Sequence, residues 1–233
     1  MAAYEFDKKR YQLKTTNLFI FPQTREELKA LIAEESNPEY KAEYEEALKQ
    51  CNEDPDNGIY HTYWKAVIRT GEERGTHVGG LFIKGAPELG TIEISFRTFE
   101  PFRGRTYAVQ GVRTFVEWAF AQKAIYEVVA VTDRENDFAI ATLEKAAFVY
   151  REGDRHIQTY SIEKPKTSWV GIYIFFGAIV GAGFGVIFNS VTAGLILGIV
   201  LAGLFGGSMD VNENKEREHV TGKAIERGKR KRR

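Results

Sequence analysis

The periodicity of apolar and polar positions changes along residues 1–163 and predicts a mixed set of helices and strands. Residues 18–21 predict a short strand that Pro22 stops. A capping-box sequence from Thr24 to Glu27 then predicts a helix that ends near Ser36. Runs rich in aromatic and β-branched residues, separated by glycine-containing turns, predict an antiparallel meander. The other predicted elements are a helix over 38–50, strands over 60–70, 78–84, 91–96 and 126–132, a helix ending near 123, a helix over 136–147, and a closing hairpin over 148–162.

These elements predict the fold class of the first segment, residues 1–163. Strands that come first and then alternate with helices are typical of an α/β or α+β domain. We expect a mixed, mostly antiparallel sheet flanked by helices, and a segment of about 160 residues is long enough to bury a substantial core.

A second segment begins at residue 164, where the pattern turns wholly apolar. Residues 167–209 contain no charged side chain. Because one membrane span needs about 20 apolar residues, this run predicts two transmembrane helices, Trp169–Phe188 and Val191–Met209, in a hairpin over residues 164–209. A helical hairpin buried inside a soluble protein is the alternative.

Small residues recur at every fourth position of both predicted spans. Gly177, Gly181 and Gly185 lie on the first span. The second carries Ser190, Gly194, Gly198, Ala202 and Gly206. Such stripes let helix backbones approach closely in lipid, so we expect tight packing within the hairpin and a homo-oligomer through the same stripes.

Charge is unevenly distributed although the whole chain has a formal net charge of zero. Residues 210–233 form a basic tail with a net charge of +4, Lys164 and Lys166 precede the first span, and residues 1–163 carry −6. Positive charge on both flanks of a hairpin predicts that the domain and the tail are cytoplasmic. The tail can also bind anionic membrane lipids, whereas the acidic domain argues against nucleic acid as a partner.

Several kinds of catalytic site have no matching pattern in this sequence. Cys51 is the single cysteine, and the four histidines show no metal-ligand spacing. We also find no nucleophile elbow, phosphate-binding Walker loop or dinucleotide fingerprint. No metal site is therefore expected, and the first ten residues do not match a signal peptide.

The stretch Phe102–Val112 joins a predicted strand to a predicted helix through a small, basic turn. The unpaired N–H groups at a helix N-terminus favour anions. Arg103 and Arg105 add side-chain charge suited to phosphate. The turn is therefore a candidate phosphate site, and an ordinary surface turn is the alternative.

The order of these elements carries a resemblance to a known family. It rests on residues 16–28, on residues 91–122 with Glu100-Pro101-Phe102-Arg103-Gly104, and on residues 126–148 with Leu143-Glu144-Lys145-Ala146-Ala147-Phe148. In this order they resemble the GNAT superfamily of acyl-CoA-dependent N-acyltransferases, and most of all the branch with ribosomal-protein N-terminal acetyltransferases. The resemblance covers about residues 12–162.

This resemblance implies a GNAT fold and a set of site residues. Acetyl-CoA would lie between two splayed strands, with Asn136 facing its pantetheine arm. Glu93 would be the general base for an amine acceptor, and Tyr150, Tyr107 or water would supply a proton to the leaving thiolate. The remaining implied cofactor-binding residues are Thr98, Arg103, Gly104, Arg105, Thr106, Tyr107 and Ala108.

The sequence also departs from the family pattern. Thr106 replaces a glycine of the pyrophosphate loop, and Ala147 stands where this branch has another glycine. Ala139 replaces a serine near the CoA sulfur, and Leu143 replaces a tyrosine that other branches use as general acid. Gln110 replaces a glutamate of the following helix.

Three interpretations follow from these patterns. The first is a membrane-anchored N-acetyltransferase that acetylates a protein N-terminus or a small-molecule amine. The second is a GNAT-fold module that binds acyl-CoA or a partner without turnover. In the third, the hairpin is the functional element and the domain regulates it.

Overall fold

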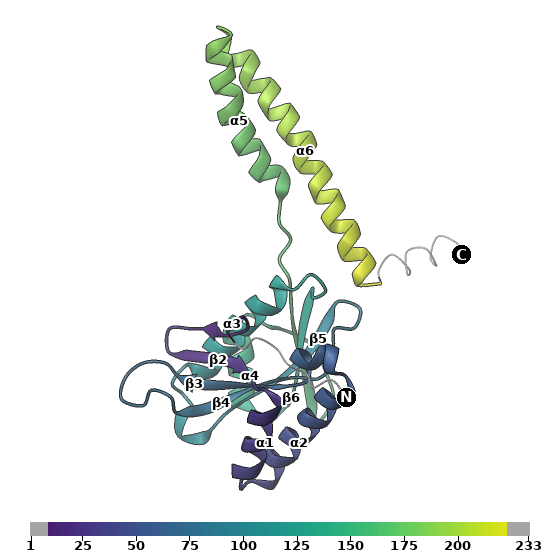
Figure 1. Cartoon of the computed structure of the whole chain (residues 1–233). Helices are drawn as coiled ribbons and strands as arrows, with labels where there is room; N and C mark the ends of the chain where they lie inside the picture. Colours follow the sequence, from purple (N-terminus) through teal and green to yellow (C-terminus); the bar gives the residue numbers. More distant parts are fainter. Residues whose placement is uncertain (1–8, 223–233) are drawn as a thin grey trace, which may run out of the picture. The chain divides into compact units, whose positions relative to one another are not determined.

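The computed structural model describes residues 9–222, which form two compact units divided between Lys164 and Pro165. The first unit contains a mixed sheet with helices, and the second is a helical hairpin (Figure 1). Each unit is described by itself below.

One eight-stranded sheet organises the first unit, with the strand order β1-β2-β3-β4-β5-β6-β8-β7. Strands β5 and β6 run parallel, and every other neighbouring pair is antiparallel, which confirms the predicted mixed, mostly antiparallel sheet. The strands are β1 Leu13–Lys14, β2 Leu18–Pro22, β3 Tyr63–Ile68, β4 His77–Ile83, β5 Thr91–Thr98, β6 Glu127–Asp133, β7 Val149–Gly153 and β8 Ile157–Glu163.

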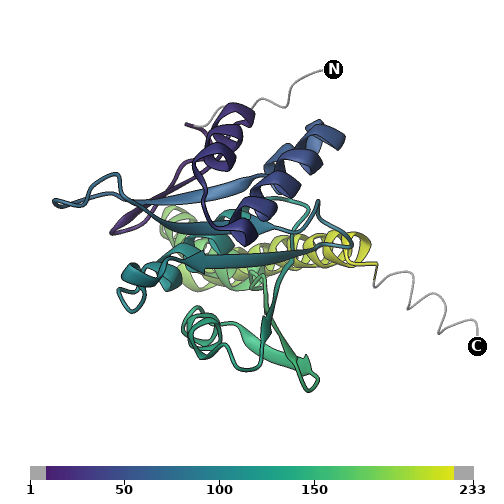
Figure 2. The same cartoon turned by 90° about the horizontal axis from the view of Figure 1, so that it is seen from below.

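Helices cover both faces of this sheet. They are α1 Arg25–Glu34, α2 Pro38–Glu53, α3 Tyr107–Ala121 and α4 Asp137–Lys145, with short 3₁₀ turns at Pro55–Tyr60 and Glu100–Phe102. The capping box at α1 forms as expected, because Thr24 accepts a bond from the Glu27 N–H and the Glu27 carboxylate accepts one from the Thr24 N–H. Figures 1 and 2 show α1 and α2 side by side on one face.

Two apolar clusters explain why the helices lie where they do. On the face of α3 and α4, Phe115 and Leu143 pack against the strands around Trp64. On the face of α1 and α2, Leu28 and Tyr44 pack against Tyr63 of β3.

Helix α5, Trp169–Ile187, and helix α6, Val191–Val220, form the hairpin of the second unit. The glycine stripes face each other across it. A Cβ on Gly181 would meet the backbone of Gly194 and Gly198, and one on Gly177 would meet Gly198 and Ala202. The stripes are thus used for contact within one chain.

The end of α6 differs from the sequence prediction. The second span was expected to stop at Met209, but the helix continues through the charged residues to Val220. Two carboxylates of this extension hold the start of α5, since Asp210 accepts the Trp169 N–H at 2.7 Å and Glu213 accepts the Trp169 indole N–H at 2.7 Å. The extension is therefore part of the hairpin rather than of a separate tail.

Candidate active site

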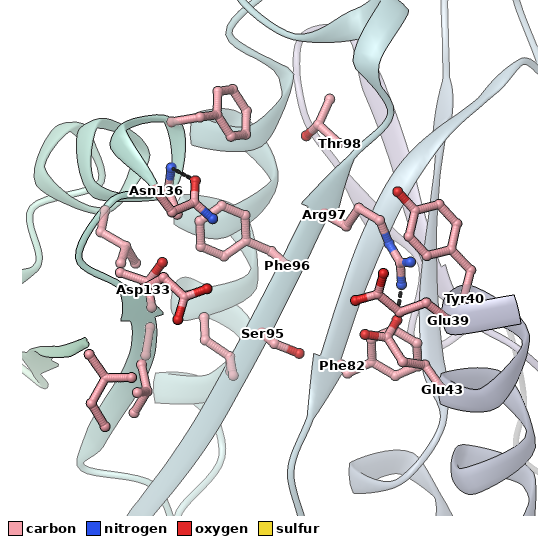
Figure 3. A pocket seen from close by; sticks show the side chains of 18 of the residues that line it. Glu39, Tyr40, Glu43, Phe82, Ser95, Phe96, Arg97, Thr98, Asp133 and Asn136 are labelled. Atoms are coloured by element: carbon pink, nitrogen blue, oxygen red, sulfur yellow. Dashed lines mark hydrogen bonds and ion pairs between the residues drawn. The ribbon is translucent and has the colours of Figure 1, made fainter. Parts of the chain in front are cut away.

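Strands β5 and β6 separate halfway along their length. They pair in register from Thr91 with Glu127 to Ile94 with Ala130. Beyond that point residues 95–98 of β5 pair with β4, and residues 131–133 of β6 pair with β8. The gap opens into a pocket of about 490 Å³, called the cleft below (Figure 3).

One side of the cleft faces helix α2 and is acidic. Glu39, Tyr40 and Glu43 of α2 line it, together with Ser95 and Arg97 of β5. Side chains two residues apart lie on the same face of a strand, so Glu93 shares its face with Ser95 and Arg97. Glu93 pairs with Val129 of β6, and Asp133 is four residues after Val129, so Asp133 lies on this face too. This side of the cleft thus carries the three carboxylates of Glu39, Glu43 and Asp133 and the one guanidinium of Arg97.

Arg97 is held firmly on this acidic side. Its guanidinium forms an ion pair with Glu43 and lies 3.6 Å from the centroid of the Tyr40 ring. The carboxylates of Glu39 and Asp133, by contrast, have no hydrogen bond or ion pair within residues 9–222. Both remain able to contact a cationic ligand (Figure 3).

The opposite side of the cleft faces helix α4 and is basic. Arg103 Nε donates to the Thr98 carbonyl at 3.3 Å, and its guanidinium lies 5.6 Å from the Phe138 ring centroid. Asn136 caps α4 by accepting the Ala139 N–H at 3.0 Å, so its amide nitrogen is available. Thr98, Arg103 and Asn136 thus line the same cleft.

The strand-to-helix turn contains two residues in the left-handed region of backbone conformation. Gly104 has φ +80° and Thr106 has φ +64°, so threonine occupies a left-handed conformation. The Thr106 hydroxyl accepts a bond from Gln110 Nε2 at 3.0 Å and does not cap α3. The first N–H groups of α3, at Tyr107 and Ala108, therefore point outward unused.

A smaller hollow of about 130 Å³ lies between this turn and helix α4. Gly104, Thr106, Tyr107 and Ala108 line it on one side and Lys145 on the other. Arg105 does not join them. Its side chain pairs with Glu73 at 2.7 Å, and this hydrogen bond raises the pKa of the Arg105 guanidinium.

The two residues expected to move protons do not line the cleft. Glu93 lies where β5 and β6 are still paired, and its carboxylate accepts from Lys84 Nζ at 2.6 Å. Tyr150 is 51% exposed on the edge strand β7, and β8 separates that strand from β6. Tyr107 lines the smaller hollow instead.

Among the polar residues of the cleft that sequence reasoning missed are Glu39, Tyr40, Ser95 and Asp133. Asp133 had a usable signal, since it directly follows an apolar central strand. The other three depend on how α2 lies over β5, which no local pattern reveals.

A family model described as an acetyltransferase (GNAT) domain matches residues 9–149, more than half of the chain. The chain belongs to the GNAT acetyltransferase family. Among curated GNAT-type relatives, the uncharacterized N-acetyltransferase YjdG of Bacillus subtilis (strain 168) is 33% identical over 73 residues. That match covers 31% of this chain and 44% of YjdG, so the chain spans less than half of this relative.

Solved structures share the GNAT fold at low sequence identity. The ribosomal-protein-S5-alanine acetyltransferase of Vibrio fischeri has a TM-score of 0.53 and 10% identity, covering 66% of this chain and 99% of its own. A GNAT-family acetyltransferase from Bacillus anthracis has a TM-score of 0.51 and 15% identity, covering 65% and 98%. These similarities establish the GNAT fold of the first unit.

Within residues 9–222 no group of three or more histidine, cysteine or carboxylate side chains could hold a metal ion. The two sides of the cleft differ in the sign of their charge, and both extend to the point where β5 and β6 separate.

Proposed function

We propose that the protein is a membrane-anchored N-acetyltransferase that transfers the acetyl group of acetyl-CoA to an amine. The observation that carries the proposal is the parting of β5 and β6 after Ile94 and Ala130, which opens a cleft with a basic side and an acidic side. An anionic donor and a cationic acceptor can thus meet from opposite faces of the sheet.

The donor would enter from the side of helix α4. The N–H groups at the start of α3 and the Arg103 guanidinium suit its pyrophosphate. The Asn136 amide and the small Ala139 side chain, which is 8% exposed, leave room for the pantetheine arm. Bound acetyl-CoA supplies the thioester that the amine attacks.

The acceptor would enter from the side of helix α2. An amine arrives as a cation at neutral pH and must lose a proton before it can attack. Glu39 and Asp133 line that side without partners, so either carboxylate can bind the cation and accept the proton. Glu93 is a second candidate for the base. Its carboxylate is paired with Lys84, so it would act through a water molecule.

A non-catalytic acyl-CoA-binding module is the alternative function, and one observation favours it. Leu143 is fully buried beside the cleft and cannot protonate a leaving thiolate. In the catalytic proposal, the Tyr40 hydroxyl or a water molecule takes that role in place of Tyr150 and Tyr107, because Tyr40 lines the cleft.

Membrane anchoring is supported by the two apolar helices. Helix α5 has 19 residues, which at 1.5 Å per residue matches a hydrocarbon core of about 30 Å. Only 11% of the most apolar window of each helix is buried, unlike a core helix of a soluble protein. We propose a two-span anchor with both flanks cytoplasmic. The terminal cluster of basic residues, 227–233, lies outside the described residues.

An acetyl-transfer assay on the full chain in detergent tests this proposal. With acetyl-CoA and a panel of amines, we expect CoA thiol release that falls at least tenfold in Glu39→Gln or Asp133→Asn. Glu93→Gln is the comparison variant, and loss of activity there alone would move the base to Glu93. Binding of acetyl-CoA without transfer to any amine would favour the non-catalytic alternative.

A further inference from the structure

A second hollow of about 520 Å³ adjoins the cleft where two turns of the backbone meet. One turn joins β6 to α4 and carries Arg134, and the other joins β7 to β8 and carries Arg155 and His156. Arg103, Asp133 and Asn136 line both this hollow and the cleft, so the two are continuous.

The backbone fixes these two turns against each other. The Arg134 N–H donates to the His156 carbonyl at 2.8 Å, which ties the turns together. Within the β7–β8 turn, one carboxylate oxygen of Asp154 accepts the N–H groups of His156 at 2.7 Å and Ile157 at 2.9 Å. These bonds hold the backbone of the two turns together and so place Arg134, Arg155 and His156 around one hollow.

Among the described residues, the basic side chains of this hollow form no ion pair, although the carboxylates of Asp133 and Glu135 also line it. Arg97, Arg105 and Arg151 of the same unit each form an ion pair. The side chains of Arg134, Arg155 and His156 make no hydrogen bond or ion pair within residues 9–222, and Arg103 donates only its Nε–H. Their guanidinium groups are therefore available to a ligand.

We propose that Arg134, Arg155 and His156, here called the arginine pocket, bind an anionic group that the amine acceptor carries. This proposal rests on the proposed function and specifies its substrate class: an amine that also bears a phosphate or carboxylate. Arginine suits both groups because its planar guanidinium can bind two of their oxygens at once.

The position of the pocket is what links the anion to the acceptor. Asp133 faces the cleft as a partner for the amine and also borders the arginine pocket, so one molecule can reach both. The CoA phosphates have a separate place at the start of α3 and the hollow beside Lys145. A CoA phosphate is nevertheless the other anionic group able to reach the arginine pocket, because Arg103 lies between that pocket and the hollow beside Lys145.

Calorimetry on the full chain in detergent, saturated with CoA, tests the arginine pocket with two matched probes. Ethanolamine and O-phosphoethanolamine share an amine and differ by one phosphate. We expect the wild-type chain to bind O-phosphoethanolamine at least tenfold more tightly than ethanolamine. The double variant Arg134→Ala/Arg155→Ala should lose this preference by about 10- to 100-fold.

Arg74→Ala is the matched control, because Arg74 is an exposed arginine of the β3–β4 loop without a described partner. It should keep the preference. Equal binding of both probes by the wild-type chain would overturn the proposal. So would a double variant that weakens CoA binding but leaves the probe preference intact, since the pocket would then bind CoA phosphate.

The proposed function can fail separately from this inference. If the chain binds O-phosphoethanolamine preferentially through the two arginines but transfers no acetyl group, the pocket stands and the reaction does not. If acetyl transfer proceeds with no effect of the arginines on either probe, the reaction stands and the pocket does not.

Discussion

At the scale of single residues, two positions hold non-glycine side chains in left-handed backbone conformations, Thr106 at φ +64° and Ala147 at φ +69°. The family resemblance expected glycine at both. Ala147 follows helix α4, where the Phe148 N–H bonds to the Leu143 carbonyl at 3.0 Å and the Ala147 N–H to the Glu144 carbonyl at 3.0 Å. This is the Schellman geometry, which favours glycine.

Ala147→Gly should therefore stabilise the domain. Relief of the left-handed strain outweighs the added freedom of the unfolded chain, and we expect the free energy of unfolding to rise by about 1 kcal/mol. Urea unfolding followed by tryptophan fluorescence measures it. Ala141→Gly, at an exposed position inside the same helix, is the control and should lower stability by about 0.5–1 kcal/mol. A destabilising effect at both positions would contradict the strain.

His77 predicts how stability depends on pH. Burial between Tyr63 and Phe99, and then the positive charge of Lys65, lower the pKa of His77 to about 4. The unfolded chain, with a His77 pKa near 6.5, binds the proton more readily, so stability is present above that value and is lost as pH falls toward 4.

Between pH 7.5 and pH 5, His77 alone should remove about 2 kcal/mol from the free energy of unfolding. His77→Gln removes the titrating group, so its stability should change less over the same range. Parallel urea titrations at the two pH values provide the comparison. Identical pH dependence in the two proteins would show that His77 is not held neutral.

At the scale of elements, the sequence predicted where helices and strands lie but not how they meet. The period of apolar positions located β2 to β6 and the four domain helices, because burial of one face leaves a local signature. The separation of β5 and β6 after Ile94 has no such signature, since β5 residues beyond it keep bonding to β4. Glu93 was therefore expected in a site that begins at Ser95.

The length of α6 was also beyond the local pattern. The charged residues after Met209 were predicted to form a tail, because a membrane span does not continue through charged side chains. In the structure, Asp210 accepts the first N–H groups of α5 and so the charged turn of α6 completes the hairpin. That contact joins residues 40 or more positions apart and cannot be read from either segment alone.

Gly181 and Gly183 provide a matched test of the hairpin. A Cβ on Gly181 would meet the α6 backbone, whereas one on Gly183 has nothing within 4 Å. Gly181→Ile should force the helices apart and Gly183→Ile should not. With cysteines placed at residues 168 and 209, beside the Trp169–Asp210 contact, oxidative crosslinking in detergent should fall only in the Gly181 variant. Equal crosslinking in both would contradict the packing.

At the scale of the whole molecule, the sign of charge differs between the two sides of the cleft, which supports the proposal of two ligands. Arg103 and Asn136 lie on one side, and Glu39 and Asp133 lie on the other. A net acidic domain with a basic cofactor side suits an anionic donor and a cationic acceptor group. The anionic group of the acceptor, which we propose binds to the arginine pocket, would be a third recognised group at the opening of the cleft.

The central claim is that the opening between β5 and β6 holds acetyl-CoA, and its most direct test is calorimetry of acetyl-CoA binding to the full chain in detergent. We expect the wild-type chain to bind, and Ala139→Trp to lose that binding because the indole would fill the cleft that Ala139 lines. Glu144→Trp, on the exposed side of the same helix, should bind like the wild type. Unchanged affinity in Ala139→Trp, or no binding by the wild-type chain, would contradict the account.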